Sequence, residues 1–295
     1  MVCSIYKSFR KLKRRGFVKR DRPVFRRDVI FLDDHLFTID LERWEVTVAT
    51  PKGRVRFPLL HGSYHERFRD WKVGQAWLVK RGEELWLKLV FSKVVKLKEP
   101  NGKALAVDVN ENNVTIASPR GFRQITTRER PIRTAYFLKR RKIQRLGGKV
   151  RLKLLMKYCS RERNRVTDIY HKVANRIVER ALEEGVTVVV MEKLRGIRKK
   201  IRYTREMNGR LHRWSFRRFQ LILEYKAKLF GLNVVYVDAR GTSRLCPICG
   251  GKLRKSPNGY RLMRCPSCGL IDDRDVIAFL NLLKRYVGSS VPPES

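Results

Sequence analysis

The chain has 295 residues, 43% of them hydrophobic, which is enough for two or three domains with packed cores. Its 68 Lys and Arg outnumber its 28 Asp and Glu, and a net charge of +40 opposes compaction unless a polyanion neutralises it, so the composition favours a cytoplasmic nucleic-acid protein. A membrane partner is not expected, because the sequence shows no run of about 18 apolar residues, no signal peptide and no basic amphipathic anchor at a terminus.

The N-terminal region, residues 1–28, is predicted to be a basic arm. It contains many Lys and Arg, and the spacing of its apolar residues Ile5, Phe9, Leu12 and Phe17 is interpreted as irregular. Two interpretations stay open: a solvated basic segment, or a tail that contacts phosphates.

Residues 29–98 are predicted to form a small antiparallel β-barrel. Apolar and polar residues alternate roughly over 39–48, which is the pattern of half-buried strands. Turn-forming residues at 51–53 and 81–83 divide the region into hairpins.

An α/β domain is predicted to begin at residue 103 with an apolar strand that contains one acid. Residues 104–109 are apolar except for Asp108. Turn-forming residues at 112–113 and 119–121 then predict a three-stranded meander, of which this strand is the first.

A basic helix pair is predicted to follow the meander. Residues 132–184 have a helical pattern interrupted at 147–148, and the stretch 139–165 holds twelve basic residues against one acid, Glu162. A solvated face is the simplest interpretation, whereas a face turned toward a polyanion accounts better for the charge. The candidate nucleic-acid-binding residues, in this pair and beyond it, are Lys139, Arg140, Arg141, Lys142, Arg145, Arg213, Arg217 and Arg218.

The remaining elements of the α/β domain alternate between strand and helix. An apolar run at 186–191 is typical of a central parallel strand, and Glu192 lies at its carboxyl end, where open α/β sheets place functional groups. A helix over 219–230 and a strand over 234–237 follow. A last helix over 272–287 has acids at its start and then an apolar face, predicted to be Val276, Phe279, Leu280 and Leu283.

This element order is that of an RNase H-like α/β fold, with a nuclease domain made of 103–240 and 271–288 and a flexible tail at 289–295. Such a sheet can bring Asp108, Glu192 and an acid of the last helix to one edge, where three carboxylates suit Mg²⁺ or Mn²⁺. Two such ions about 4 Å apart could activate a water for phosphodiester cleavage. Each acid alone could equally cap a turn or pair with a neighbouring cation.

Four cysteines have the spacing of a zinc ribbon, predicted over residues 241–270. Two Cys-x-x-Cys pairs are separated by fifteen residues, and a glycine follows each pair. Four thiolates leave no open coordination position, so this zinc is predicted to be structural. The predicted zinc ligands are Cys246, Cys249, Cys265 and Cys268.

Several of these stretches together resemble the TnpB family, the OrfB-type insertion-sequence transposases with a C-terminal zinc ribbon that are related to type V CRISPR effectors. The resemblance covers about residues 30–287. It rests on Ala106-Val-Asp108-Val, on the strand end at Glu192, on 219–231, on Thr242-Ser-Arg-Leu-Cys246-Pro-Ile-Cys249-Gly, and on Asp273-Arg-Asp275-Val-x-Ala.

The resemblance implies an RNA-guided DNA endonuclease of a transposable element, with a RuvC-like site, a guide RNA and a DNA target. Within the acidic cluster it selects Asp275, so the implied catalytic metal ligands are Asp108, Glu192 and Asp275. Two features depart from the family pattern. Ile277 stands where the family usually has Asn, and only the basic arm precedes the barrel, in place of a further strand and a helical recognition domain.

Two other functions remain open. The chain could be a shortened, non-cleaving DNA- or RNA-binding regulator of the same fold, or an unguided RNase H-like nuclease. The presence of all three acids favours an enzyme over the non-cleaving regulator. Whether cleavage depends on bound RNA would distinguish the RNA-guided endonuclease from the unguided nuclease. The sequence predicts no oligomeric state.

Overall fold

The computed structural model describes residues 2–24, 29–194, 203–238, 240–257, 259 and 262–290. The chain divides into two compact units, Met1–Val94 and Val95–Ser295. Residues 195–202, between the strand predicted at 186–191 and the helix predicted at 219–230, and the end of the predicted tail, 291–295, lie outside the described residues. In the part of the chain that is described, no helix has the length and apolar character that crossing a bilayer requires.

The first unit begins with a helix where an irregular arm was predicted. Helix α1 spans Val2–Arg14. Ile5, Phe9 and Leu12 are spaced by four and three residues, so they lie on one side of the helix, where they line a cavity of about 340 Å³ with Val18 and other residues of the following segment. The spacing interpreted as irregular is thus helical, and the basic residues Lys11, Lys13 and Arg14 lie in the last turn of α1.

The rest of the first unit consists of antiparallel strands and one short helix. The strands form two three-stranded sheets, in the orders β1-β5-β6 and β2-β3-β4, rather than the single closed sheet that was predicted. Both predicted hairpins are present, and one apolar cluster that includes Leu32, Phe37 and Ala76 draws residues from both sheets. The elements are β1 (Val29–Leu32), β2 (Phe37–Asp40), β3 (Glu45–Thr50), β4 (Gly53–Pro58), α2 (Ser63–Glu66), β5 (Lys72–Arg81) and β6 (Glu84–Ser92).

The second unit is built on a five-stranded mixed sheet in the order β11-β10-β7-β8-β9. The predicted meander is confirmed, because β7, β8 and β9 pair antiparallel in sequence order. The predicted central parallel strand is also confirmed, since β10 pairs parallel with both β7 and β11. The strands are β7 (Ala104–Val109), β8 (Asn113–Ser118), β9 (Gly121–Thr126), β10 (Val188–Glu192) and β11 (Asn233–Val237).

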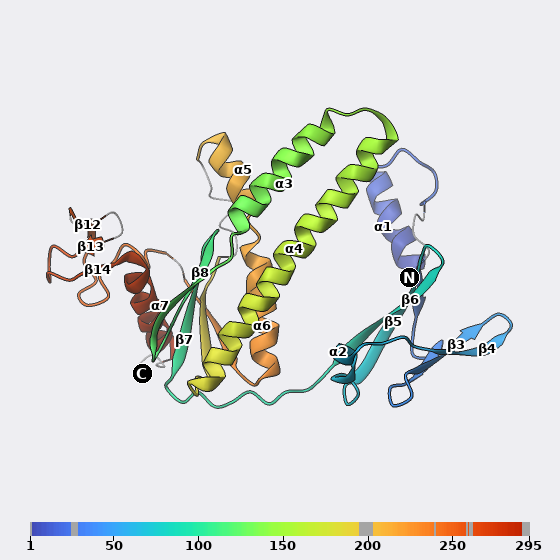
Figure 1. The fold of residues 1–295 in the computed structure, drawn as a ribbon, viewed down its shortest axis with the longest axis horizontal. Helices are drawn as coiled ribbons and strands as arrows, with labels where there is room; N and C mark the ends of the chain where they lie inside the picture. The colour runs from blue at the N-terminus through green and yellow to red at the C-terminus, as the bar shows by residue number, and fades with distance from the viewer. Residues whose placement is uncertain are drawn as a thin grey trace. The chain divides into compact units, whose positions relative to one another are not determined.

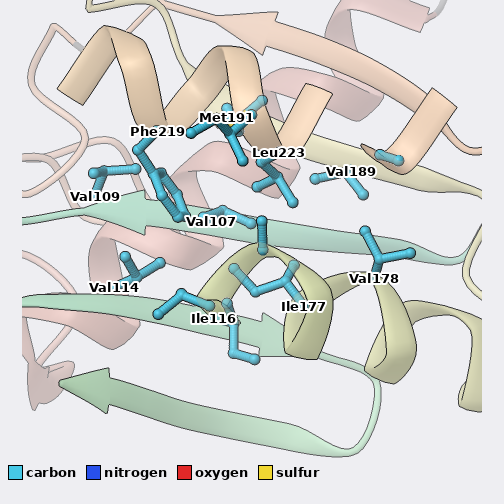
Figure 2. Close-up of a cluster of buried hydrophobic side chains, with 14 of the residues drawn as sticks. Val107, Val109, Val114, Ile116, Ile177, Val178, Val189, Met191, Phe219 and Leu223 are labelled. Atoms are coloured by element: carbon cyan, nitrogen blue, oxygen red, sulfur yellow. The ribbon is translucent and has the colours of Figure 1, made fainter. Parts of the chain in front are cut away.

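Helices cover both faces of this sheet (Figure 1). Alternate residues of a strand point to opposite faces, so β7 and β10 each supply two apolar sets. One set, exemplified by Val107 and Met191, packs with α4 and α6 (Figure 2); the other, exemplified by Ala106 and Val190, packs with α7. The helices are α3 (Glu129–Gln144), α4 (Gly148–Glu183), α5 (Arg205–Arg213), α6 (Phe216–Leu229) and α7 (Arg274–Ser290).

The buried face of α7 differs from the predicted one. Ile277 and Leu282 are fully buried, whereas Leu280, assigned to the apolar face, is 38% exposed. Phe279 and Leu283 do pack against the core, but only partly buried. The buried face is therefore rotated relative to the predicted one, and it includes the polar residue Asn281, which an apolar pattern does not select.

Candidate metal centres

Asp108 and Glu192 lie at matching positions on adjacent parallel strands. In the register of β7 and β10, Val107 pairs with Met191, and Asp108 and Glu192 are the next residue on each strand. Ala106 and Val190, two positions earlier, belong to the cluster on the α7 face of the sheet. The alternation of a strand therefore directs both carboxylates to that same face, near the carboxyl ends of the strands.

Helix α7 brings a third carboxylate to this face. It packs against β7, β10 and β11, and Asp275 lies in its first turn. Of the three clustered acids, Asp272 and Asp273 belong instead to a short strand, β14 (Ile271–Asp273), which pairs with β13 (Leu262–Arg264). Asp275 is thus the one acid of the three that belongs to the helix.

Burial and mutual repulsion perturb the titration of these carboxyls. Burial raises the pKa of Asp108, the negative charge of Asp275 raises it further, and a hydrogen bond from Asn110 Nδ2 (2.9 Å) opposes both. Burial also raises the pKa of Glu192 to about 7, and the charge of Asp108 contributes to this rise. Carboxylates that destabilise one another's charged form are a set that a cation would stabilise.

The donor set fits a hard divalent cation, since carboxylate oxygens are the preferred ligands of Mg²⁺ and Mn²⁺. Asp108 interacts electrostatically with both Asp275 and Glu192, but the three carboxylates do not form one compact group of ligand atoms. Within the described parts of the chain, the four-cysteine cluster is the one group of three or more potential ligand atoms that all lie within 4.8 Å of one another.

That cluster consists of the predicted thiols of Cys246, Cys249, Cys265 and Cys268. The Sγ atoms of Cys246 and Cys268 are 3.4 Å apart, as are those of Cys249 and Cys265. Four thiolates about 2.3 Å from a shared ion would be separated by similar distances, so the cluster could hold a metal ion such as zinc.

The two Cys-x-x-Cys loops have the same backbone conformation. Gly250 N–H donates to Cys246 O (2.9 Å), and Gly269 N–H donates to Cys265 O (3.1 Å). Both glycines have a left-handed φ, 74° and 77°, which other residues adopt only with strain. The N–H of Cys268 lowers the pKa of the Cys265 thiol to about 6, against the opposing effect of burial, and so favours the thiolate that binds metal.

Four further residues near the carboxylates had been given no role from the sequence. Asp238 directly follows β11, and its charge raises the pKa of Glu192, whereas the charge of Arg285 lowers it. Thr242 Oγ1 donates to Glu192 Oε1 (2.9 Å), and Asn281 donates to the backbone around Thr242. Asp238 could have been found by the strand-end argument that identified Glu192; the contacts of the other three require the tertiary structure.

The predicted nucleic-acid-binding residues fall into two groups. Arg140 and Arg213 are part-buried, and each has a partner within the protein: Arg140 pairs with Glu162, and the Arg213 guanidinium lies 4.3 Å from the Phe137 ring centroid. The other six predicted residues are exposed, namely Lys139, Arg141, Lys142, Arg145, Arg217 and Arg218.

Glu162, the single acid of the basic helix stretch, lies in a buried ionic network between α3, α4 and the start of α6. Its carboxylate pairs with Arg140 and with Arg133, the latter at 3.1 Å. Arg133 also pairs with Glu129, which is 2% exposed and accepts hydrogen bonds from Tyr170 Oη and from Ser215 N–H (3.1 Å). This network fixes the helix pair to the rest of the unit.

Comparison with known proteins identifies the family to which this chain belongs. A model of the "Cas12f1-like, TNB domain" family matches residues 216–282. A TnpB-like protein of Methanocaldococcus jannaschii is 38% identical over 277 residues, covering 88% of this chain and 97% of that protein. A CRISPR-associated endodeoxyribonuclease Cas12f1 of Syntrophomonas palmitatica is 30% identical over 125 residues, covering 42% of this chain and 24% of its own length.

Among solved structures, the protein in a cryo-EM structure of a Cas12f1–sgRNA–target DNA complex aligns at 18% identity with a TM-score of 0.48, over 89% of this chain and 69% of that chain. That likeness is too low to transfer details of a site. The relationship to the archaeal protein, by contrast, extends over nearly the whole of both sequences. On this similarity, the chain belongs to the TnpB-like protein family, which is related to the type V CRISPR effectors.

Proposed function

We propose that this protein is an RNA-guided, metal-dependent DNA endonuclease associated with a transposable element and acting in the cytoplasm. Its RNase H-like, RuvC-like domain would comprise 103–240 and 271–288, with a zinc ribbon at 241–270. The observation that carries the proposal is that Asp108 and Glu192 occupy one face of adjacent parallel strands, under the helix that bears Asp275.

Asp108, Glu192 and Asp275 would hold Mg²⁺ or Mn²⁺ in this proposal. A bound divalent ion supplies activation of a water and stabilisation of the leaving oxygen in phosphodiester cleavage. The chain's own residues prepare the carboxylates: Asn110 holds Asp108 by a hydrogen bond of 2.9 Å, and apolar residues of the sheet and α7, such as Ala106 and Val190, pack two positions before the acids.

The four cysteines would hold a structural Zn²⁺. All four thiols approach one another, and four thiolates fill a tetrahedral site, so no coordination position is left for substrate. The zinc would therefore stabilise the ribbon rather than take part in the reaction.

A guide RNA and a DNA target are the proposed partners. The net charge of +40 and the exposed basic residues of α3 and α6 suit a polyanion of either kind. The relative from Syntrophomonas palmitatica is named as a CRISPR-associated endodeoxyribonuclease, which supports DNA as the substrate proposed for this chain.

The proposal can be tested with the purified full chain and the RNA that co-purifies with it. The complex is incubated with a plasmid library and Mg²⁺, and both the RNA and the cleaved plasmids are sequenced. The proposed function predicts cleavage next to sequences complementary to the RNA, abolished by prior RNase treatment. Tight binding without cleavage would support a non-cleaving regulator, and cleavage that survives RNase treatment would support an unguided nuclease.

The structure also predicts different roles for two neighbouring basic residues of α3. Arg140→Ala is expected to lower the free energy of unfolding by roughly 2–3 kcal/mol, below the usual cost of breaking a buried ion pair because Arg133 still neutralises Glu162. Lys142→Ala, at an exposed position, is expected to change it by less than about 0.5 kcal/mol.

The two variants are compared by urea denaturation and by nucleic-acid binding over a series of salt concentrations. Lys142→Ala should weaken nucleic-acid binding. It should also make the plot of log binding constant against log salt concentration less steep, by about one unit of slope. Equal denaturation midpoints for the two variants would contradict the assignment of Arg140 to the buried network.

A further inference from the structure

Glu192 is held by a residue from outside the sheet. Thr242 Oγ1 donates a hydrogen bond of 2.9 Å to Glu192 Oε1, and Thr242 itself is 4% exposed. Thr242 lies in the segment between β11 and the first metal-site cysteine, four residues before Cys246. The orientation of this carboxylate therefore depends on where that segment lies.

Helix α7 fixes the segment from the other side. Asn281 is buried, and its Nδ2 donates to Thr242 O (2.7 Å) and to Leu245 O (2.8 Å). Arg285, one turn further along α7, donates to Arg240 O (2.6 Å). The helix that carries Asp275 thus binds the chain just before Cys246 at three carbonyl groups.

The segment continues directly into the cysteine cluster. Leu245, the second carbonyl held by Asn281, precedes Cys246, whose N–H donates to Gly251 O (2.8 Å) within the first cysteine loop. The short strand segments around the cluster have only two or three residues each, β12 (Arg254–Lys255) and β13 among them, so a metal bound by the cysteines would add a constraint on Cys246 that these strands supply only weakly.

We propose that Thr242 and Asn281 are positioning residues that couple the four-cysteine site to the carboxylate site. With the thiolates bound to metal, Cys246 is fixed, Asn281 fixes Thr242 relative to α7, and the Thr242 hydroxyl orients Glu192 toward Asp108 and Asp275. The inference rests on the proposed function, because it requires these three acids to bind a divalent cation.

The test compares Thr242→Val, which removes the hydroxyl and keeps the shape, with Thr242→Ser, which keeps the hydroxyl. The full-length protein is freed of nucleic acid, and its Mn²⁺ affinity is measured by electron paramagnetic resonance of the free ion. Thr242→Val is expected to weaken Mn²⁺ binding by about 10- to 100-fold, as is typical for loss of a residue that orients a metal ligand. Thr242→Ser is expected to remain within a few-fold of the wild-type affinity, and the zinc content of both variants should be unchanged.

A second arm tests the coupling itself. Removal of zinc from the wild-type protein should weaken Mn²⁺ binding by a factor similar to that of Thr242→Val. Removal of zinc from the Thr242→Val variant should weaken Mn²⁺ binding little further, because both changes release the carboxylate of Glu192. Mn²⁺ prefers oxygen ligands, so it does not report on the emptied thiols.

The outcomes separate the inference from the function on which it rests. Wild-type Mn²⁺ affinity in Thr242→Val, an equal loss in Thr242→Ser, or additive effects of zinc removal and Thr242→Val would each overturn the coupling while leaving the carboxylate site intact. Absence of Mn²⁺ binding in the wild-type protein, or binding unaffected by Asp108→Ala, would overturn the proposed function.

Discussion

Asp108→Ala is expected to lower the rate of DNA cleavage by roughly 10³-fold, which corresponds to about 4 kcal/mol of transition-state stabilisation, while nucleic-acid binding stays nearly unchanged. The expectation follows from the position of Asp108 on the central strand β7, beside Glu192 on β10 and under the influence of the Asp275 charge. Removing this acid would deprive the cation of a ligand without touching the exposed basic residues. Cleavage is measured under single-turnover conditions and binding by gel shift.

The matched control is Asp168→Ala. Asp168 is an exposed acid on α4 that pairs with Lys172 at 2.8 Å, so its loss changes the net charge by the same amount on a helix that packs on the opposite face of the sheet from α7. It should leave the cleavage rate within about twofold, because an exposed helix pair contributes little free energy. If Asp108→Ala cut as fast as this control, the assignment of the catalytic metal site would be wrong.

Cys249→Ser is expected to reduce zinc content and thermal stability together. Replacement of one thiolate in four should weaken zinc binding by more than the roughly 10- to 100-fold that loss of an outer orienting residue costs. The strands around the site are too short to hold their conformation alone, so metal binding would supply much of their folding free energy. The zinc content is measured by inductively coupled plasma mass spectrometry, and the unfolding temperature by differential scanning calorimetry.

Cys159→Ser provides the control for a lost thiol. Cys159 lies exposed on α4, outside the four-cysteine cluster, and its replacement should change neither zinc content nor the unfolding temperature measurably. A Cys249→Ser protein that retained the zinc stoichiometry and melting temperature of this control would show that the cluster is not the zinc site.

The sequence was most informative where one regular pattern dominated. The strands that carry Asp108 and Glu192 were predicted from short apolar runs; the first was confirmed as the opening strand of the meander, and the second as a central parallel strand. The helix pair was predicted from its periodicity and from the glycines at 147–148, which the structure places at the start of α4.

The sequence was least informative where a polar residue is buried or where pairing is long-range. Asn281 was given no place on the predicted face of α7, because no local pattern shows that its amide would donate to the carbonyls of Thr242 and Leu245. The grouping of the first unit's strands into two sheets depends on pairing such as that of β1 with β5, which links residues about fifty positions apart. Periodicity specifies a strand but not its partner.

The face of the sheet beneath α7 carries small side chains. Ala104 and Ala106 of β7 lie there with Leu282 of the helix, whereas Leu105, Val107 and Val109 fill the opposite face. Small side chains leave room for α7 to pack on the strand that carries Asp108, and the charge of Asp275 in the first turn of that helix raises the pKa of Asp108. Larger residues at Ala104 and Ala106 would therefore be expected to displace α7 and weaken the proposed carboxylate site, although every polar group in the sequence would be unchanged.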